Sequence, residues 1–258
     1  MSEITCEEML DIVLKAGSLI LENGGETYRT EQSIIKIATA LGAESASAFV
    51  TPTVIMFSYT DSNKHYHSAI RRITNRTVNL KKVSQVNDLV RRLVKRGKSS
   101  NPRQIANLLD RIQKAPLYPK LLVVIFAAFS SFFFACMFGG SMKEALCALC
   151  IGFLLRGMLI SLEKLPISSF FVSLLSGGLI SILAELCFSL KWIPSSEIVL
   201  ISVLMQVVPG LAIVNSIRDI IAGDLVSGAA RLLDAFMIAA GISVGSVLGI
   251  LLFSGIIG

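Results

Sequence analysis

Long runs of hydrophobic residues dominate the second half of the chain. Five such runs occur, at residues 121–138, 145–162, 166–190, 193–217 and 232–257. A membrane-spanning helix needs about 20 mostly apolar residues. A backbone surrounded by lipid must also satisfy its own hydrogen bonds, which a helix does. The pattern therefore predicts a membrane protein with an all-α bundle of five transmembrane helices.

The first half shows shorter and more varied periodicities. Thr5 and Glu8 have the spacing of a capping box, and apolar residues then recur at helical spacing up to Gly24. The other predicted elements are helices at residues 27–41, 84–96 and 102–114 and strands at 49–59 and 65–73. The sequence thus predicts a small α+β domain at residues 1–118, followed by a transmembrane domain at 119–258.

The distribution of charge separates these two regions further. The chain is 53% hydrophobic and only 16% charged, whereas soluble domains carry about 25% charged residues. Residues 1–120 hold 18 Lys and Arg against 11 Asp and Glu, and the remainder holds 6 against 7. An ordinary soluble enzyme is therefore not expected. The acidic first eleven residues do not resemble a cleavable signal peptide, so the first region is expected to stay on the cytoplasmic side.

Basic residues also predict the orientation in the membrane. With a cytoplasmic N-terminus, one set of basic residues lies at the cytoplasmic ends of the spans: Lys114, Lys120, Lys164, Arg218 and Arg231. Only Lys143 and Lys191 lie at the outer ends. Because cytoplasmic ends carry the excess of Lys and Arg, we expect the N-terminal domain in the cytoplasm and, after five spans, the C-terminus outside.

Few residues suggest catalysis or metal binding. His65 and His67 are two positions apart on a predicted strand, but no Cys or further His accompanies them in the sequence, so a solvated strand face is favoured. Cys147 and Cys150 lie inside a predicted span, where packing is favoured over redox chemistry. The basic stretch 91–98 favours a membrane surface or a solvated helix over nucleic acid. We therefore expect no catalytic residue, metal or cofactor.

Polar residues inside the predicted spans are better candidates. The third span carries small residues at intervals of four that end at Glu185, a pattern that fits either helix packing or a functional carboxylate. In the fifth span, Gly241, Gly245 and Gly249 form a repeated G-x-x-x-G pattern on the face of Asp234. This face is expected to contact another helix.

The segment from Gln206 to Asp234 is the strongest candidate site. Pro209 must kink or break the fourth span, and broken helices at membrane depth line cavities. The predicted substrate-binding residues are Gln206, Pro209, Gly210, Asn215, Arg218 and Arg231. The predicted ion-coupling residues are Asp224, Asp219, Asp234 and Glu185. Asp219 is favoured as a structural partner of the adjacent Arg218, and Asp224 as the coupling carboxylate. A cytoplasmic loop held by ion pairs is the alternative.

Several of these segments resemble the threonine/serine exporter (ThrE) family. The resemblance lies in residues 24–29, 41–44 and 49–53, and more specifically in residues 209–210, 215–219, 222–228 and 231–233. The length is similar to that of the larger, YjjP-type subunit of split exporters, in which a smaller, YjjB-like membrane protein supplies further spans. The resemblance implies a hetero-oligomeric, proton-driven secondary exporter of threonine and serine, or of dicarboxylates such as succinate, in the plasma (inner) membrane.

Two other classes of function remain open. A membrane-anchored enzyme should bring titratable groups together in residues 1–115, whereas the sequence scatters them. A non-catalytic sensor or scaffold would not need ionisable groups beside a broken helix. Export of a small carboxylate-bearing metabolite is therefore the favoured hypothesis, and the membrane-anchored enzyme is the runner-up.

Overall fold

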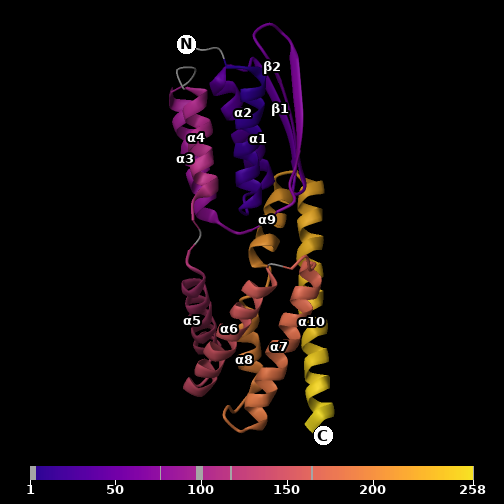
Figure 1. The fold of residues 1–258 in the computed structure, drawn as a ribbon. Helices are drawn as coiled ribbons and strands as arrows, with labels where there is room; N and C mark the ends of the chain where they lie inside the picture. Colours follow the sequence, from indigo (N-terminus) through magenta and orange to yellow (C-terminus); the bar gives the residue numbers. More distant parts are fainter. Residues whose placement is uncertain (1–3, 76, 97–100, 117, 164, 258) are drawn as a thin grey trace. The chain divides into compact units, whose positions relative to one another are not determined.

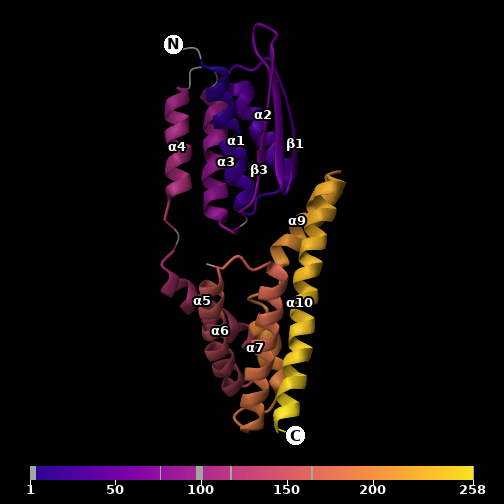
Figure 2. The ribbon, with the colours of Figure 1, turned by 45° about the vertical axis from the view of Figure 1, so that its right-hand side comes forward.

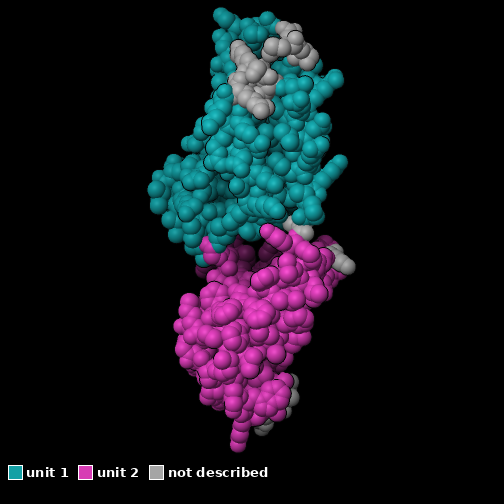
Figure 3. Space-filling model, turned by 90° about the vertical axis from the view of Figure 1, so that its left-hand side faces the viewer, with its two compact units in different colours: residues 1–116, 211–232 teal, residues 117–210, 233–258 magenta. Residues whose placement is uncertain are grey.

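The computed structural model describes residues 4–75, 77–96, 101–116, 118–163 and 165–257. The chain forms two compact units, coloured separately in Figure 3. Unit 1 comprises Met1–Pro116 and Leu211–Leu232, and unit 2 comprises Leu117–Gly210 and Leu233–Gly258. The N-terminal region is thus completed by a segment from much later in the chain.

Unit 1 consists of helices packed on one face of a small antiparallel sheet (Figures 1 and 2). Its elements are α1 (Cys6–Glu22), α2 (Thr27–Leu41), β1 (Ser45–Thr51), β2 (Val54–Thr60), β3 (Tyr66–Arg72), α3 (Leu80–Arg96), α4 (Pro102–Lys114) and most of α9 (Gly210–Ile221). The strand order is β1-β2-β3. The predicted capping box at Thr5 and Glu8 is confirmed, and α2 has the predicted bounds.

The sheet has three strands where the sequence predicted two. The predicted strand 49–59 belongs to both β1 and β2, which pair with each other through a tight turn at Pro52 and Thr53. Proline has no backbone N–H to donate to a strand ladder, so a single strand through Pro52 would lose a hydrogen bond. The alternation of side chains continues across the turn, which is why the sequence pattern predicted one strand instead of two.

The core of unit 1 lies between the helices and the inner face of the sheet. Ile12 and Val13 of α1, Ile34 of α2 and Ile55 and Phe57 of β2 are almost completely buried there. Helix α4 packs beside α1, and Lys15 forms an ion pair with Asp110. The opposite face of the sheet is open.

The secondary-structure elements of unit 2 are all helices among its described residues. It contains α5 (Lys120–Met137), α6 (Met142–Leu162), α7 (Ser169–Ser189), α8 (Ser196–Leu204) and most of α10 (Leu225–Ile257). Among the described helices, α5, α6, α7 and α10 are long and apolar enough to cross a membrane. The structure therefore supports four of the five predicted spans.

The predicted fourth span, 193–217, is not one continuous helix. Helix α8 ends at Leu204 and α9 begins at Gly210, immediately after Pro209. Proline lacks the N–H that would bond the preceding turn and its ring obstructs that turn, so the predicted break is confirmed. Between the predicted fourth and fifth spans the chain is largely helical, because α9 continues to Ile221 and α10 already begins at Leu225. Gly223, with φ of +94°, allows this sharp turn.

The repeated glycine pattern of α10 packs against α7 of the same chain. A Cβ atom at Gly241 would lie 2.7 Å from the carbonyl oxygen of Phe170, and one at Gly249 would lie 2.7 Å from that of Gly178. At Gly245 the distance to the Leu174 carbonyl oxygen would be only 2.0 Å. The predicted contact with another helix is confirmed. Because α7 already occupies this glycine face, it is not open to a separate subunit.

Replacement of Gly245 by alanine tests this packing. The new methyl group cannot fit without moving the α7 backbone, and overpacking of this kind costs about 1–3 kcal/mol. We expect Gly245→Ala to lower the melting temperature of the purified protein in detergent. Gly255→Ala is the matched control, since a Cβ atom there meets nothing within 4 Å. Equal melting temperatures for the two variants would contradict the α7–α10 contact.

Candidate functional site

The N-terminus of α2 carries a buried carboxylate between two guanidinium groups. Gly24, with φ of +91°, turns the chain after α1 so that Glu26 becomes the N-cap residue of α2. Only 8% of the Glu26 side chain is exposed. Its Oε1 accepts a hydrogen bond from Nη1 of Arg218 at 2.5 Å, and its Oε2 lies 2.6 Å from Nε of Arg29. One carboxylate therefore orients two arginines.

A second carboxylate, that of Asp219, is completely buried beside the first. Its Oδ1 accepts the backbone N–H of Thr27 at 3.3 Å, and its Oδ2 lies 3.3 Å from Nε of Arg231. Arg231 in turn donates from Nη2 to the carbonyl oxygen of Gly25 at 2.8 Å. The expected pairing of Asp219 with Arg218 is therefore wrong. Adjacent residues of a helix point in different directions, and Arg218 reaches Glu26 instead.

Two further side chains connect residues 211–232 to the N-terminal part of unit 1. Asn215 donates from Nδ2 to the carbonyl oxygen of Gly24 at 3.1 Å, and Ser227 donates to that of Val50 at 3.0 Å. We use the term ion-pair network for the charged and amide side chains that meet at the start of α2. Its members are Glu26, Arg29, Asn215, Arg218, Asp219 and Arg231. It brings together four of the ten residues predicted from the sequence.

Glu31 forms a group of carboxylates with Asp219 and Asp224. Its Oε1 accepts the backbone N–H of Val50 at 2.8 Å. Burial raises the pKa of Glu31 above its usual value, and the negative charges of Asp224 and Asp219 raise it further, against the lowering effect of the Val50 hydrogen bond. Burial also raises the pKa of Asp219, although Thr27 and Arg231 oppose this shift. Unit 1 thus holds carboxyl groups that take up protons more readily than exposed ones.

The other predicted site residues lie outside this network. In unit 2, Gln206 donates from Nε2 to the Ser131 hydroxyl at 2.7 Å and to the Ala127 carbonyl oxygen at 3.1 Å. Glu185 accepts a hydrogen bond from the Ser196 hydroxyl at 2.7 Å. The side chain of Asp234 is exposed on α10. Pro209 lies in the break between α8 and α9, and Gly210 is the first residue of α9.

Sequence reasoning did not assign Glu26 or Glu31 to the site. Glu26 lies within the segment 24–29 that carries the family resemblance. The sequence therefore places Glu26 in a family motif, but it does not indicate that this residue binds two arginines. Glu31 had no such signal, because an acidic residue in the middle of an amphipathic helix is typical of a solvated face. The tertiary structure assigns Glu31 to the site, because it brings the charges of Asp219 and Asp224 near this side chain.

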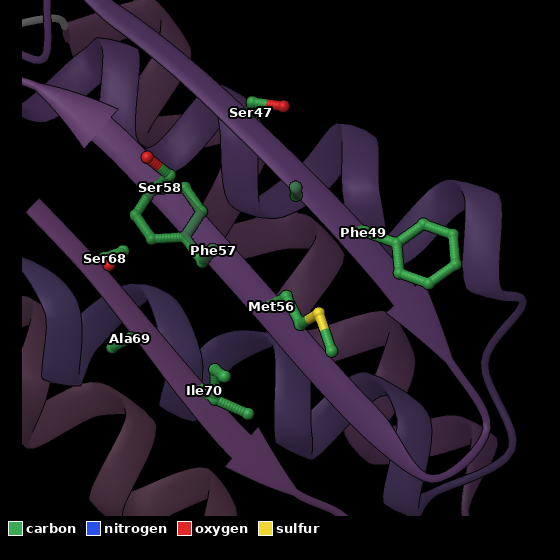
Figure 4. Close-up of a pocket in the computed structure, with 9 residues that line it drawn as sticks. Ser47, Phe49, Met56, Phe57, Ser58, Ser68, Ala69 and Ile70 are labelled. Carbon is green, nitrogen blue, oxygen red and sulfur yellow. The ribbon is translucent and has the colours of Figure 1, made fainter. Parts of the chain in front are cut away.

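Open pockets also lie on the described part of unit 1, and two of them differ clearly in chemistry. One, of about 630 Å³, lies between α2 and α3 and is lined by four cations, Arg29, Lys36, Arg91 and Lys95. The other, of about 280 Å³, lies on the sheet (Figure 4). Phe49, Met56 and Ile70 form a cross-strand row there, and all three are exposed.

Four long apolar helices and a polar unit with a buried ion-pair network define a membrane protein. The family model described as "Putative threonine/serine exporter" matches residues 11–253, and the chain therefore belongs to the threonine/serine exporter (ThrE) family. The predicted resemblance is confirmed.

Two curated relatives agree with this assignment. A threonine/serine exporter of Corynebacterium glutamicum is 22% identical over 94% of this chain and 50% of its own length. A probable threonine/serine exporter of Mycobacterium tuberculosis is 20% identical over 96% of this chain and 47% of its own length. The chain thus spans about half the length of these relatives. Both are named as exporters, which supports a transport protein over an enzyme. No solved structure matches the chain.

The raised pKa of Glu31 predicts a dependence of stability on pH. A carboxyl group whose pKa is higher in the folded protein stabilises the fold at low pH, and this contribution is lost as the pH rises through the folded pKa. Glu31→Gln keeps an oxygen to accept the Val50 N–H but removes the charge. We expect the melting temperature of the variant, relative to the native protein, to increase between pH 4.5 and 7.5. A difference that does not change over this range would contradict the raised pKa.

Proposed function

We propose that this chain is a subunit of a secondary exporter of small carboxylate-bearing metabolites, such as threonine, serine or succinate. The proposal includes transport across the plasma (inner) membrane, driven by the proton gradient. The main support for this proposal is that one buried carboxylate, Glu26, holds two arginines in a chain of the ThrE family. The proposal also includes a second, smaller membrane subunit of the YjjB-like type, in keeping with the resemblance to split exporters.

Arg218 is the proposed binding group for the substrate carboxylate. Its side chain is 56% exposed, while the Glu26 carboxylate that orients it is buried. A guanidinium offers five N–H donors in a planar fork, so donors remain for a ligand while Glu26 holds Nη1. Charge-assisted bonds from such a fork suit the carboxylate shared by amino acids and dicarboxylates. Arg29, which is similarly exposed, offers a second cation on the same Glu26 carboxylate.

Glu31 and Asp224 are the proposed proton-coupling groups. The pKa of Glu31 is raised by burial and by the negative charge of Asp224, so the Asp224 charge favours protonation of Glu31. The Oδ2 atom of Asp224 is buried and has no hydrogen-bond partner among the described residues. Asp219 has a structural role in this proposal, because its charge is held by Thr27 and Arg231.

Substitution of Arg218 tests the substrate-binding role. Arg218→Lys keeps the charge but loses the planar fork, and a hydrogen bond to a charged group contributes about 1.5–3 kcal/mol, so we expect export to fall about tenfold or more. The assay measures efflux of labelled serine, threonine and succinate from cells that express the chain with its smaller partner. Arg103→Lys, an exposed arginine of α4, is the matched control. Normal export by Arg218→Lys at normal abundance would exclude this role.

Replacement of Asp224 and Asp219 separates coupling from structure. Asp224→Asn should abolish proton-driven efflux but leave exchange of substrate across equal gradients, because a neutral side chain cannot carry the proton. Asp219→Asn should instead lower the amount of folded protein, because it removes a buried charge that Arg231 contacts at 3.3 Å. If Asp224→Asn exports normally against a gradient, the coupling role is wrong.

Reporter fusions test the proposed orientation. A reporter after Lys114 should be cytoplasmic, and one after Gly258 should lie outside, because five crossings place the ends on opposite sides. The fifth crossing must then come from the segment that contains α8 and α9. Two ends on the same side would reduce the number of crossings to an even one and overturn the five-span topology.

A further inference from the structure

Three side chains of different chemistry meet at one corner of unit 1, away from the ion-pair network. Cys6 is the first residue of α1, Asp61 follows β2, and His67 lies in β3. The Sγ atom of Cys6 lies 3.4 Å from Nε2 of His67, and Oδ2 of Asp61 lies 3.1 Å from the same nitrogen. All three atoms lie within 4.8 Å of one another. The sequence separates them by up to 61 positions.

The position of His67 corrects the expectation from the sequence. His65 and His67 were expected on one solvated face of a strand, but β3 begins at Tyr66, after His65. His67 pairs with Tyr59 across the sheet, and its ring stacks on the Tyr59 ring with centroids 5.1 Å apart. Tyr59 is buried, so His67 lies on the inner face of the sheet, next to Cys6. The Cys that the sequence pattern lacked is supplied by α1.

The approach of sulfur and oxygen to the same ring nitrogen is typical of metal ligands. A single nitrogen carries at most one proton, so it cannot form a good hydrogen bond to both neighbours at once. In a Cys-His-Asp relay the carboxylate would contact the other ring nitrogen. A tetrahedral Zn²⁺ ion would instead hold S and N about 3.5 Å apart and N and O about 3.3 Å apart, from the usual zinc–ligand lengths. The observed separations are close to these values.

We propose that Cys6, Asp61 and His67 bind a Zn²⁺ ion. One sulfur, one imidazole nitrogen and one carboxylate oxygen form a ligand set that zinc accepts, whereas Ca²⁺ and Mg²⁺ prefer oxygen alone. Three protein ligands leave the fourth position to water. The ion connects the start of α1 to the β2–β3 hairpin.

Neighbouring groups hold the ligands in place. The Oδ1 atom of Asp61 accepts backbone N–H groups from Asn63 at 2.8 Å and His65 at 2.9 Å, which leaves Oδ2 directed at His67. The buried Tyr59 ring stacks on the His67 ring and fixes its orientation. Such outer contacts commonly orient metal ligands. About a fifth of the Asp61 side chain and a quarter of the His67 side chain are exposed, so an ion can enter from solvent.

Zinc titration of the full-length protein in detergent tests the site. After treatment with a chelator, the protein is titrated with Zn²⁺ against a chromophoric competitor, and then with Co²⁺ to detect thiolate-to-cobalt charge transfer. We expect one ion per chain and at least tenfold weaker binding in Cys6→Ser and Asp61→Asn. Asp61→Asn keeps an oxygen for both turn hydrogen bonds. Cys136→Ser, which removes an exposed cysteine of α5, is the matched control and should bind as the native protein does.

Cysteine labelling of the native protein gives a second measurement that needs no variant. Bound Zn²⁺ should slow alkylation of Cys6, measured by peptide mass spectrometry, and leave that of Cys136 unchanged. The proposal is overturned if Zn²⁺ does not change the labelling of Cys6, or if both site variants bind zinc as tightly as the native protein. Neither measurement involves transport, so the result is independent of the exporter function proposed above.

Discussion

The complete burial of the Asp219 carboxylate is the constraint on which the polar part of the structure depends. A buried charge is tolerated only where hydrogen bonds and an opposite charge replace water. Thr27 at the start of α2 and Arg231 on α10 meet this need, and Arg231 also binds the Gly25 carbonyl oxygen. The Asp219 side chain thereby connects α9 to α10 and to the start of α2, which lies 192 positions earlier in the sequence. This explains why residues 211–232 form part of unit 1.

Around this centre, the charges fall into an inner and an outer group. The inner pair, Asp219 and Arg231, is largely buried and has the geometry of a structural contact. In the outer group, Arg218 and Arg29 share Glu26 but expose more than half of their side chains. An anion can therefore approach the outer cations while the inner pair keeps the helices in position. This division fits the proposed reversible binding of a small carboxylate at the outer cations.

Unit 2 is stabilised differently from unit 1. Its described helices pack through small residues and internal hydrogen bonds. Carbonyl oxygens of α7 fit against glycines of α10 where any larger residue would collide. Polar side chains bind inside the unit, as Gln206 does with Ser131 and Glu185 with Ser196. Unpaired polar groups are costly in lipid, so this internal pairing is what a membrane-spanning unit requires. The prediction that these two residues serve a transport site has no support from these contacts.

The sequence by itself determined the features that depend on neighbouring residues. These include the apolar spans, the capping box before α1 and the helix break at Pro209, because periodicity and proline geometry act locally. It did not reveal the turn at Pro52, where side-chain alternation ran through two strands. Only the tertiary structure decided that Asp219 pairs with Arg231, that Glu31 faces other carboxylates and that Cys6 meets His67. Those contacts join segments separated by many residues, and local spacing carries no information about which distant partner a side chain reaches.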